Sequence, residues 1–123
     1  MTDRTFDIVV WGATGFTGAL VAEYLLAQYG LGGDLRWAIA GRSQEKLDSV
    51  KAELGADAAD LATLVADSFD EESLAAMTAS TKVVITTVGP YAQYGSPLVA
   101  ACVANGTHYC DLAGEAQWIR RMI

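Results

Sequence analysis

Three glycines separated by two residues each, Gly12, Gly15 and Gly18, stand between an apolar run and a segment of helical period. Glycine at these places allows a tight turn and close approach of the backbone to a pyrophosphate, while the following helix offers free N–H groups and a positive dipole. A phosphate-binding turn requires this placement after a strand and before a helix. We therefore expect residues 12–18 to bind a dinucleotide; a tight turn without a ligand is the alternative.

The remaining residues of this turn carry side chains that could add to the binding. Thr14 and Thr17 have hydroxyls that either donate to a phosphate or cap the helix, and the sequence leaves both interpretations open. Phe16 lies between them and belongs to the same candidate site. We expect the backbone N–H groups to matter more for binding than these side chains.

The second expected strand is followed by Gly41, Arg42 and Ser43. An NAD site has Asp or Glu at this place to bind the ribose 2′-hydroxyl, whereas an arginine accommodates a 2′-phosphate. Arg42 can pair with that phosphate and lie over the adenine, and Ser43 can donate a hydrogen bond to it. The sequence therefore favours NADP over NAD as cofactor; the alternative is a solvated turn arginine.

Two further strand ends complete the candidate cofactor site. Asp67 and Ser68 follow the third expected strand, where a side chain can reach the adenine, although Asp67 could equally begin a helix. The fourth strand ends beside the point where the strand order reverses, so its last residues should line the ribose and nicotinamide. These residues are Thr87, Val88, Gly89, Pro90 and Tyr91. Tyr91 is the aromatic residue that we expect nearest the chemistry.

No complete set of groups for proton transfer is visible in the sequence. None of the five tyrosines has the lysine four residues later that short-chain reductases use, and His108 has no acid-base partner, so we interpret it as structural. Cys102 and Cys110 lack a metal-ligand spacing and lie in apolar surroundings, which favours two buried free thiols. We expect no metal site and leave the catalytic residues unassigned.

Strand-length apolar runs alternate with segments of helical period, which is typical of consecutive βαβ units. We expect strands at 6–11, 35–40, 61–66, 82–88 and 108–112, helices at 17–29, 44–54, 71–78 and 96–105, and a further helix from 117. The expected caps are Ser43 for the second helix, Ser68 or Asp70 for the third, and Ser96 before Pro97 for the fourth. The pattern predicts an α/β fold of the Rossmann type in one domain, residues 1–123: a doubly wound, three-layer α/β/α arrangement around a parallel sheet of about five strands.

Charge and hydropathy limit the partners. The formal net charge of −7 repels nucleic acid and anionic membrane surfaces, but backbone N–H groups at a helix terminus still bind a dinucleotide locally. No apolar run approaches the ~18 residues of a membrane span, and Met1–Arg4 leads into the first strand without a signal-peptide pattern. We expect a cytoplasmic protein that binds neither nucleic acid nor a membrane.

The whole chain resembles the N-terminal domain of the saccharopine dehydrogenase-like oxidoreductases, and it is most similar to the branch with the mycobacterial trans-acting enoyl reductases. Four stretches carry the resemblance: residues 12–18, Ala40–Ser43, residues 87–99 and His108–Glu115. The resemblance implies hydride transfer from a nicotinamide cofactor held on this domain, with most of the substrate site on a following domain. The chain would then be a fragment, inactive alone, and a homodimer is compatible with it.

What the resemblance implies about the substrate differs between its branches. In the enoyl-reductase branch, the implied substrate is a carbon–carbon double bond of a polyketide-derived lipid intermediate, which a partner synthase delivers. Saccharopine dehydrogenases proper instead make or break a carbon–nitrogen bond. Asp111 and Glu115 match acidic positions of the family pattern and either reach the substrate or cap backbone groups, of which capping is favoured. The sequence alone does not choose the substrate.

Two alternatives from other classes stay open, because a fold and a cofactor do not establish chemistry. A non-catalytic NADP-sensing module would bind the cofactor and report it through protein contacts. An assembly subunit with a vestigial site would fold and bind no dinucleotide. The leading hypothesis is an NADPH-dependent reductase.

Overall fold

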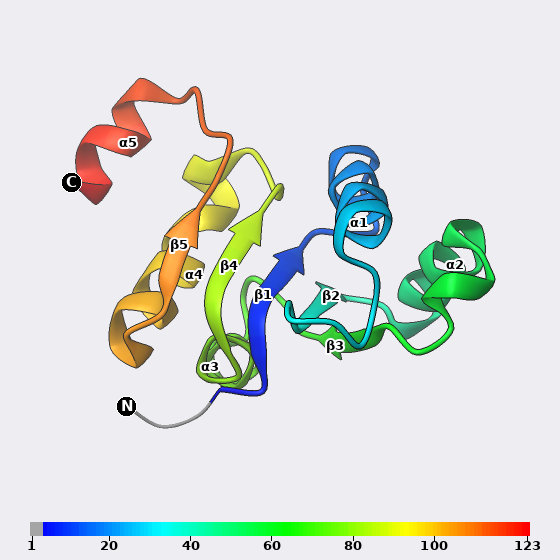
Figure 1. Cartoon of the computed structure of the whole chain (residues 1–123). Helices are drawn as coiled ribbons and strands as arrows, with labels where there is room; N and C mark the ends of the chain where they lie inside the picture. The colour runs from blue at the N-terminus through cyan, green and yellow to red at the C-terminus, as the bar shows by residue number, and fades with distance from the viewer. Residues whose placement is uncertain (1–3) are drawn as a thin grey trace.

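A five-stranded parallel sheet lies between two layers of helices (Figure 1). In the computed structural model, which describes residues 4–123, the strands are β1 (Phe6–Trp11), β2 (Trp37–Gly41), β3 (Ala62–Val65), β4 (Thr81–Thr86) and β5 (His108–Cys110). The helices are α1 (Phe16–Tyr29), α2 (Gln44–Leu54), the 3-10 turn η1 (Ala56–Ala58), α3 (Glu71–Ala79), α4 (Tyr91–Asn105) and α5 (Ala116–Met122). The strand order β3-β2-β1-β4-β5 confirms the expected doubly wound α/β fold.

The central strands are apolar on both faces because helices cover both faces. On one face, Val9 of β1 and Val84 of β4 pack against α3 and α4 through residues such as Leu74 and Leu98. On the other face, buried side chains of β1 and β2 pack against α1 and α2: Val10, Ile39, Ala22 and Leu47. Figure 1 shows α1 and α2 on one side of the sheet and α3 and α4 on the other.

The start of α4 differs from the expectation. The helix begins at Tyr91 rather than at Ser96, and Pro97 lies inside it. The reason is a tertiary contact: the Glu115 carboxylate accepts hydrogen bonds from the Tyr91 and Ala92 N–H groups, so the helix needs no local hydroxyl cap. The Ser96 hydroxyl accepts a hydrogen bond from Trp118 Nε1 instead, at 3.0 Å.

Some of the other local expectations are confirmed and others are wrong. Ser43 caps α2 by accepting from the Lys46 N–H, as expected. Asp70, and not Ser68, caps α3 through the N–H groups of Glu72 and Ser73. Cys102 is buried, and burial raises the pKa of its thiol to about 11. Cys110 is exposed, contrary to the expectation, because β5 is an edge strand.

The amino ends of the strands are closed by polar contacts. The Asp7 carboxylate on β1 forms ion pairs with Arg36, just before β2, and with Lys82 on β4, at 3.2 and 3.1 Å. Within residues 4–123, no helix has the length and hydropathy to cross a bilayer. Met1–Asp3, part of the terminus inspected for a signal peptide, lie outside the described residues.

Candidate functional site

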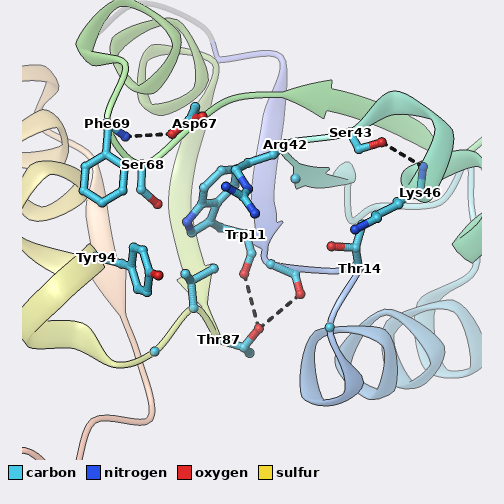
Figure 2. Close-up of a pocket in the computed structure, with 15 residues that line it drawn as sticks. Trp11, Thr14, Arg42, Ser43, Lys46, Asp67, Ser68, Phe69, Thr87 and Tyr94 are labelled. Atoms are coloured by element: carbon cyan, nitrogen blue, oxygen red, sulfur yellow. Dashed lines mark hydrogen bonds between the residues drawn. The ribbon is translucent and has the colours of Figure 1, made fainter.

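A cavity of about 570 Å³ opens at the carboxyl ends of β1 to β4 (Figure 2). Its volume lies within the range of about 300 to 1,000 Å³ that is usual for small-ligand and cofactor sites. It also lies where parallel sheets of this order bind nucleotides, beside the reversal between β1 and β4. The lining includes ten of the residues predicted from the sequence: Gly12, Thr14, Gly15, Arg42, Ser43, Asp67, Ser68, Thr87, Val88 and Gly89.

The turn between β1 and α1 forms the floor of the cavity. Gly12 has a φ of +89°, a conformation that favours glycine. A Cβ atom on Gly18 would lie 2.1 Å from the Gly12 carbonyl oxygen, so only glycine lets α1 approach the turn this closely. Gly15 is the N-cap of α1 and supplies no side-chain oxygen, and the first helical turn carries no acidic residue. The positive end of the α1 dipole therefore faces the cavity without a neutralising carboxylate.

Three residues of this turn do not line the cavity. Phe16, Thr17 and Gly18 form the first turn of α1 behind it, and the Phe16 side chain is exposed. Since no side chain caps α1, neither Thr17 nor Thr14 acts as its cap. Thr14 lines the cavity, and this location favours its other expected role, as a hydroxyl donor.

A basic corner of the cavity lies between the end of β2 and the first turn of α2. It consists of Arg42, Ser43 and Lys46. The Ser43 Oγ accepts from the Lys46 N–H at 3.3 Å, which leaves the Ser43 hydroxyl proton free to donate. Arg42 and Lys46 are exposed and form no salt bridge with the described residues, and Figure 2 shows Lys46 extending toward Thr14. This corner is suited to a phosphate dianion.

The opposite wall follows β3. The Asp67 carboxylate accepts a hydrogen bond from the Phe69 N–H at 2.9 Å and so shapes the loop that leads into α3. Ser68 is buried beside it. The Phe69 ring, 66% exposed, lies with its centroid 5.6 Å from that of Tyr94 on α4. The pair gives this side of the cavity an aromatic surface (Figure 2).

The third wall is the segment after β4. Thr87 lies against the turn of β1 through its N–H, which donates to the Trp11 carbonyl at 3.1 Å, and Val88 and Gly89 continue along the cavity. Pro90 and Tyr91 do not line it. Tyr91 is buried, and this burial raises the pKa of its phenol. The aromatic residue that α4 contributes to the cavity is therefore Tyr94, three residues after Tyr91.

The two acidic residues after β5 bind backbone groups, as expected for caps. Asp111 accepts from the Ala113 N–H at 3.0 Å and from the Tyr109 hydroxyl at 2.6 Å. Burial and the bonded Asp111 carboxylate raise the pKa of Tyr109 far above its usual value. His108 is exposed. No cluster of three metal-ligating side chains occurs within residues 4–123.

Residues 8–122 match the family model for the saccharopine dehydrogenase NADP binding domain. The chain belongs to this family. Membership confirms both the resemblance found in the sequence and NADP as the cofactor. The stretches that carried the resemblance include the turn, Arg42 and Ser43 of the basic corner, and the segment after β4, and each of them contributes residues to the lining of the cavity.

Curated relatives and solved structures agree with the assignment. The trans-acting enoyl reductase of Mycobacterium tuberculosis strain H37Rv is 50% identical over 98% of the chain, and that of Mycobacterium leprae is also 50% identical over 98%. The chain spans 28% of the length of each. Saccharopine dehydrogenase (L-Glu forming) from Saccharomyces cerevisiae superposes with a TM-score of 0.70 at 15% identity, over 93% of this chain and 24% of that one. The NADP(H) complex of Citrobacter triphenylmethane reductase superposes with a TM-score of 0.70 at 23% identity, over 87% and 37% of the two chains. At these identities the two structures show the shared fold.

Sequence reasoning missed five residues of the lining: Trp11, Gly41, Lys46, Phe69 and Tyr94. Lys46 had a local signal, because a residue three positions after the N-cap Ser43 lies in the first turn of α2. Phe69 directly follows the predicted Ser68. Tyr94 had no local signal, because the helix that carries it was expected to begin after it.

Proposed function

We propose that the chain is the cofactor domain of a longer enoyl reductase and binds NADPH in the cavity at the carboxyl ends of its strands. The observation that carries the proposal is the basic corner. Arg42, Ser43 and Lys46 line the same cavity from the end of β2 and the first turn of α2, where an NAD site would have an acidic residue. Such a corner fits the 2′-phosphate that distinguishes NADP from NAD.

The other parts of the cavity fit the rest of the dinucleotide. The pyrophosphate would lie on the turn from Gly12 to Gly18, where the backbone of Phe16 and Thr17 offers N–H groups at the α1 terminus. Asp67, Ser68 and Phe69 would hold the adenine side. Thr87, Val88 and Gly89 would line the nicotinamide side, supported from behind by Pro90 and Tyr91. Bound NADPH supplies a hydride.

The activity is inferred from the relatives. They are named trans-acting enoyl reductases, and this chain corresponds to 28% of their length. We infer that the substrate is a carbon–carbon double bond in a small or carrier-bound lipid intermediate, bound mainly by parts of the protein outside this chain. The domain alone should then bind NADPH and turn over little. A cytoplasmic location and a homodimer stay predictions from the sequence.

Calorimetric titration with NADPH and NADH tests the cofactor site. We expect the chain to prefer NADPH, and we expect Arg42→Ala and Lys46→Met each to weaken NADPH binding about tenfold or more, since a charged hydrogen bond contributes about 1.5 to 3 kcal/mol. NADH binding should change little. Lys51→Met, at the other end of α2, is the matched control and should preserve the preference.

Each other outcome has a distinct meaning. Equal binding of NADPH and NADH would remove the basic corner from the site. Binding of neither would mean that parts of the protein outside this chain complete the pocket or that the site is vestigial. For the full-length protein, transfer of deuteride from labelled NADPH to an enoyl substrate supports the reductase. Cofactor-dependent partner binding without such transfer would support the sensing module instead.

A further inference from the structure

The N-terminus of α4 has no local cap. Its N-cap residue is Pro90, which has no side-chain oxygen, and the first turn of the helix carries no acidic residue. The first N–H groups of a helix have no acceptor within the helix. In α4 the first two of these belong to Tyr91 and Ala92.

Glu115 supplies both acceptors from more than 20 residues further along the chain. One carboxylate oxygen accepts from the Tyr91 N–H at 2.6 Å, and the other accepts from the Ala92 N–H at 3.0 Å. Hydrogen bonds to an ionised carboxylate are among the stronger ones in proteins. The negative charge also lies at the positive end of the helix dipole. Glu115 therefore joins the loop after β5 to the start of α4.

Neighbouring contacts hold this junction in place. The Tyr91 hydroxyl donates to the Thr86 carbonyl at 3.3 Å and accepts from the Leu112 N–H at 3.2 Å. The Tyr91 ring stacks on Trp118 of α5, with centroids 5.5 Å apart. Gly95 leaves room for that indole, since a Cβ there would lie 2.7 Å from it. The junction is therefore packed on the side away from the cavity.

The shape of the cavity depends on this junction, because the segment that lines the cavity after β4 leads directly into α4. Thr87, Val88 and Gly89 form a wall of the cavity, and the wall joins α4 at Pro90. The first turn of α4 also carries Tyr94 on the same cavity. Glu115 itself does not line the cavity. We propose that Glu115 is a positioning residue, which holds the nicotinamide-side wall in place by fixing the start of α4.

The inference rests on the proposed cofactor site, and the test compares two ligands that fill different parts of it. NADPH would contact all walls, whereas 2′,5′-ADP would contact only the turn, the basic corner and the adenine side. We expect Glu115→Ala to weaken NADPH binding about tenfold and 2′,5′-ADP binding only about twofold in calorimetry. The segment 87–89 would contact NADPH alone, whereas the start of α4 reaches the adenine side only through Tyr94, which shares that side with Phe69. Glu115→Gln keeps one carbonyl acceptor and should give an intermediate loss.

Asn105→Ala is the control. Asn105 lies at the opposite end of α4, where its amide donates a hydrogen bond to the hydroxyl of Thr78 on α3. This substitution should lower the melting temperature without changing the ratio of the affinities for NADPH and 2′,5′-ADP. The inference would be overturned by any of three results. These are equal weakening of NADPH and 2′,5′-ADP binding by the Glu115 substitutions, unchanged NADPH binding in them, and a selective loss of NADPH binding in Asn105→Ala as well. If Glu115→Ala does not fold, Glu115→Gln is judged by the same criteria. Failure of the unaltered chain to bind either ligand would refute the cofactor site itself.

Discussion

Gly18 has no room for a side chain, which explains why the glycine spacing could predict the tight turn between β1 and α1. The contact that excludes a Cβ atom is made with the Gly12 carbonyl oxygen, six residues earlier in the same turn. Both partners of the contact therefore lie within one short stretch of sequence. A pattern in the sequence can predict a contact of this kind because no distant residue takes part in it.

Gly18→Ala should destabilise the fold and remove NADPH binding together. The added methyl group forces α1 away from the turn, and overpacking of this kind costs about 1 to 3 kcal/mol in the free energy of unfolding. Urea denaturation and calorimetry would measure the two effects. Gly33→Ala is the control, since the nearest atom to its Cβ lies at 3.5 Å, an ordinary contact. Wild-type stability in Gly18→Ala would contradict the geometry.

Some residues of the cavity could be predicted from the local sequence, whereas others depend on contacts between distant elements. Arg42 and Ser43 follow a strand directly, so their place at its carboxyl end was predictable from the sequence. Tyr94 lines the cavity because of where α4 begins, and Glu115 determines that start from a distant position. The exposure of Cys110 likewise depends on β5 being an edge strand. Sequence patterns predicted the elements, whereas contacts between elements decided these details.

At the scale of the elements, Asp7 connects three neighbouring strands at their amino ends. Its carboxylate accepts from the Arg36 backbone N–H at 2.9 Å and pairs with the charged groups of Arg36 and Lys82. The hydrogen bond from that N–H, followed by the Arg36 guanidinium, holds the pKa of Asp7 well below its usual value. The ionised carboxylate is thus favoured by the folded chain.

The stability of the chain should therefore fall in acid. Because the pKa of Asp7 is lower in the folded than in the unfolded chain, its contribution is complete above the unfolded value of about 4 and is lost as the pH falls below it. We expect urea midpoints to decrease between pH 6 and pH 2, and to decrease less in Asp7→Asn. The same pH dependence in both proteins would show that Asp7 has no part in it.

Across the whole molecule, the two ends of the sheet have different roles. The cavity occupies the carboxyl ends of the strands, and at the amino ends the Arg4 guanidinium donates to backbone carbonyls. Its acceptors are Thr78 at the end of α3, Thr81 at the start of β4 and Asn105 at the end of α4. Arg4 thereby connects two helices and the sheet at the end opposite the cavity.

Arg4→Met should lower stability and leave cofactor binding unchanged. Loss of charged hydrogen bonds to these carbonyls should cost about 1.5 to 3 kcal/mol in the free energy of unfolding. NADPH affinity, measured by calorimetry well below the melting temperature, should match the wild type. Arg121→Met, on the exposed side of α5, is the control for loss of a charge alone. A weakened NADPH affinity in Arg4→Met would show that the two ends are coupled.

The central position of β1 has a consequence for the chain as it leaves the ribosome. Of the five strands of this sheet β1 is made first, and it pairs with β2 on one side and with β4 on the other. Its second edge therefore has no partner until Thr81–Thr86 have been synthesised. An unpaired edge that carries Ile8, Val9 and Val10 is a template for association with other chains. The second edge of β1 thus stays open to association with other chains until the residues up to Thr86 have been synthesised.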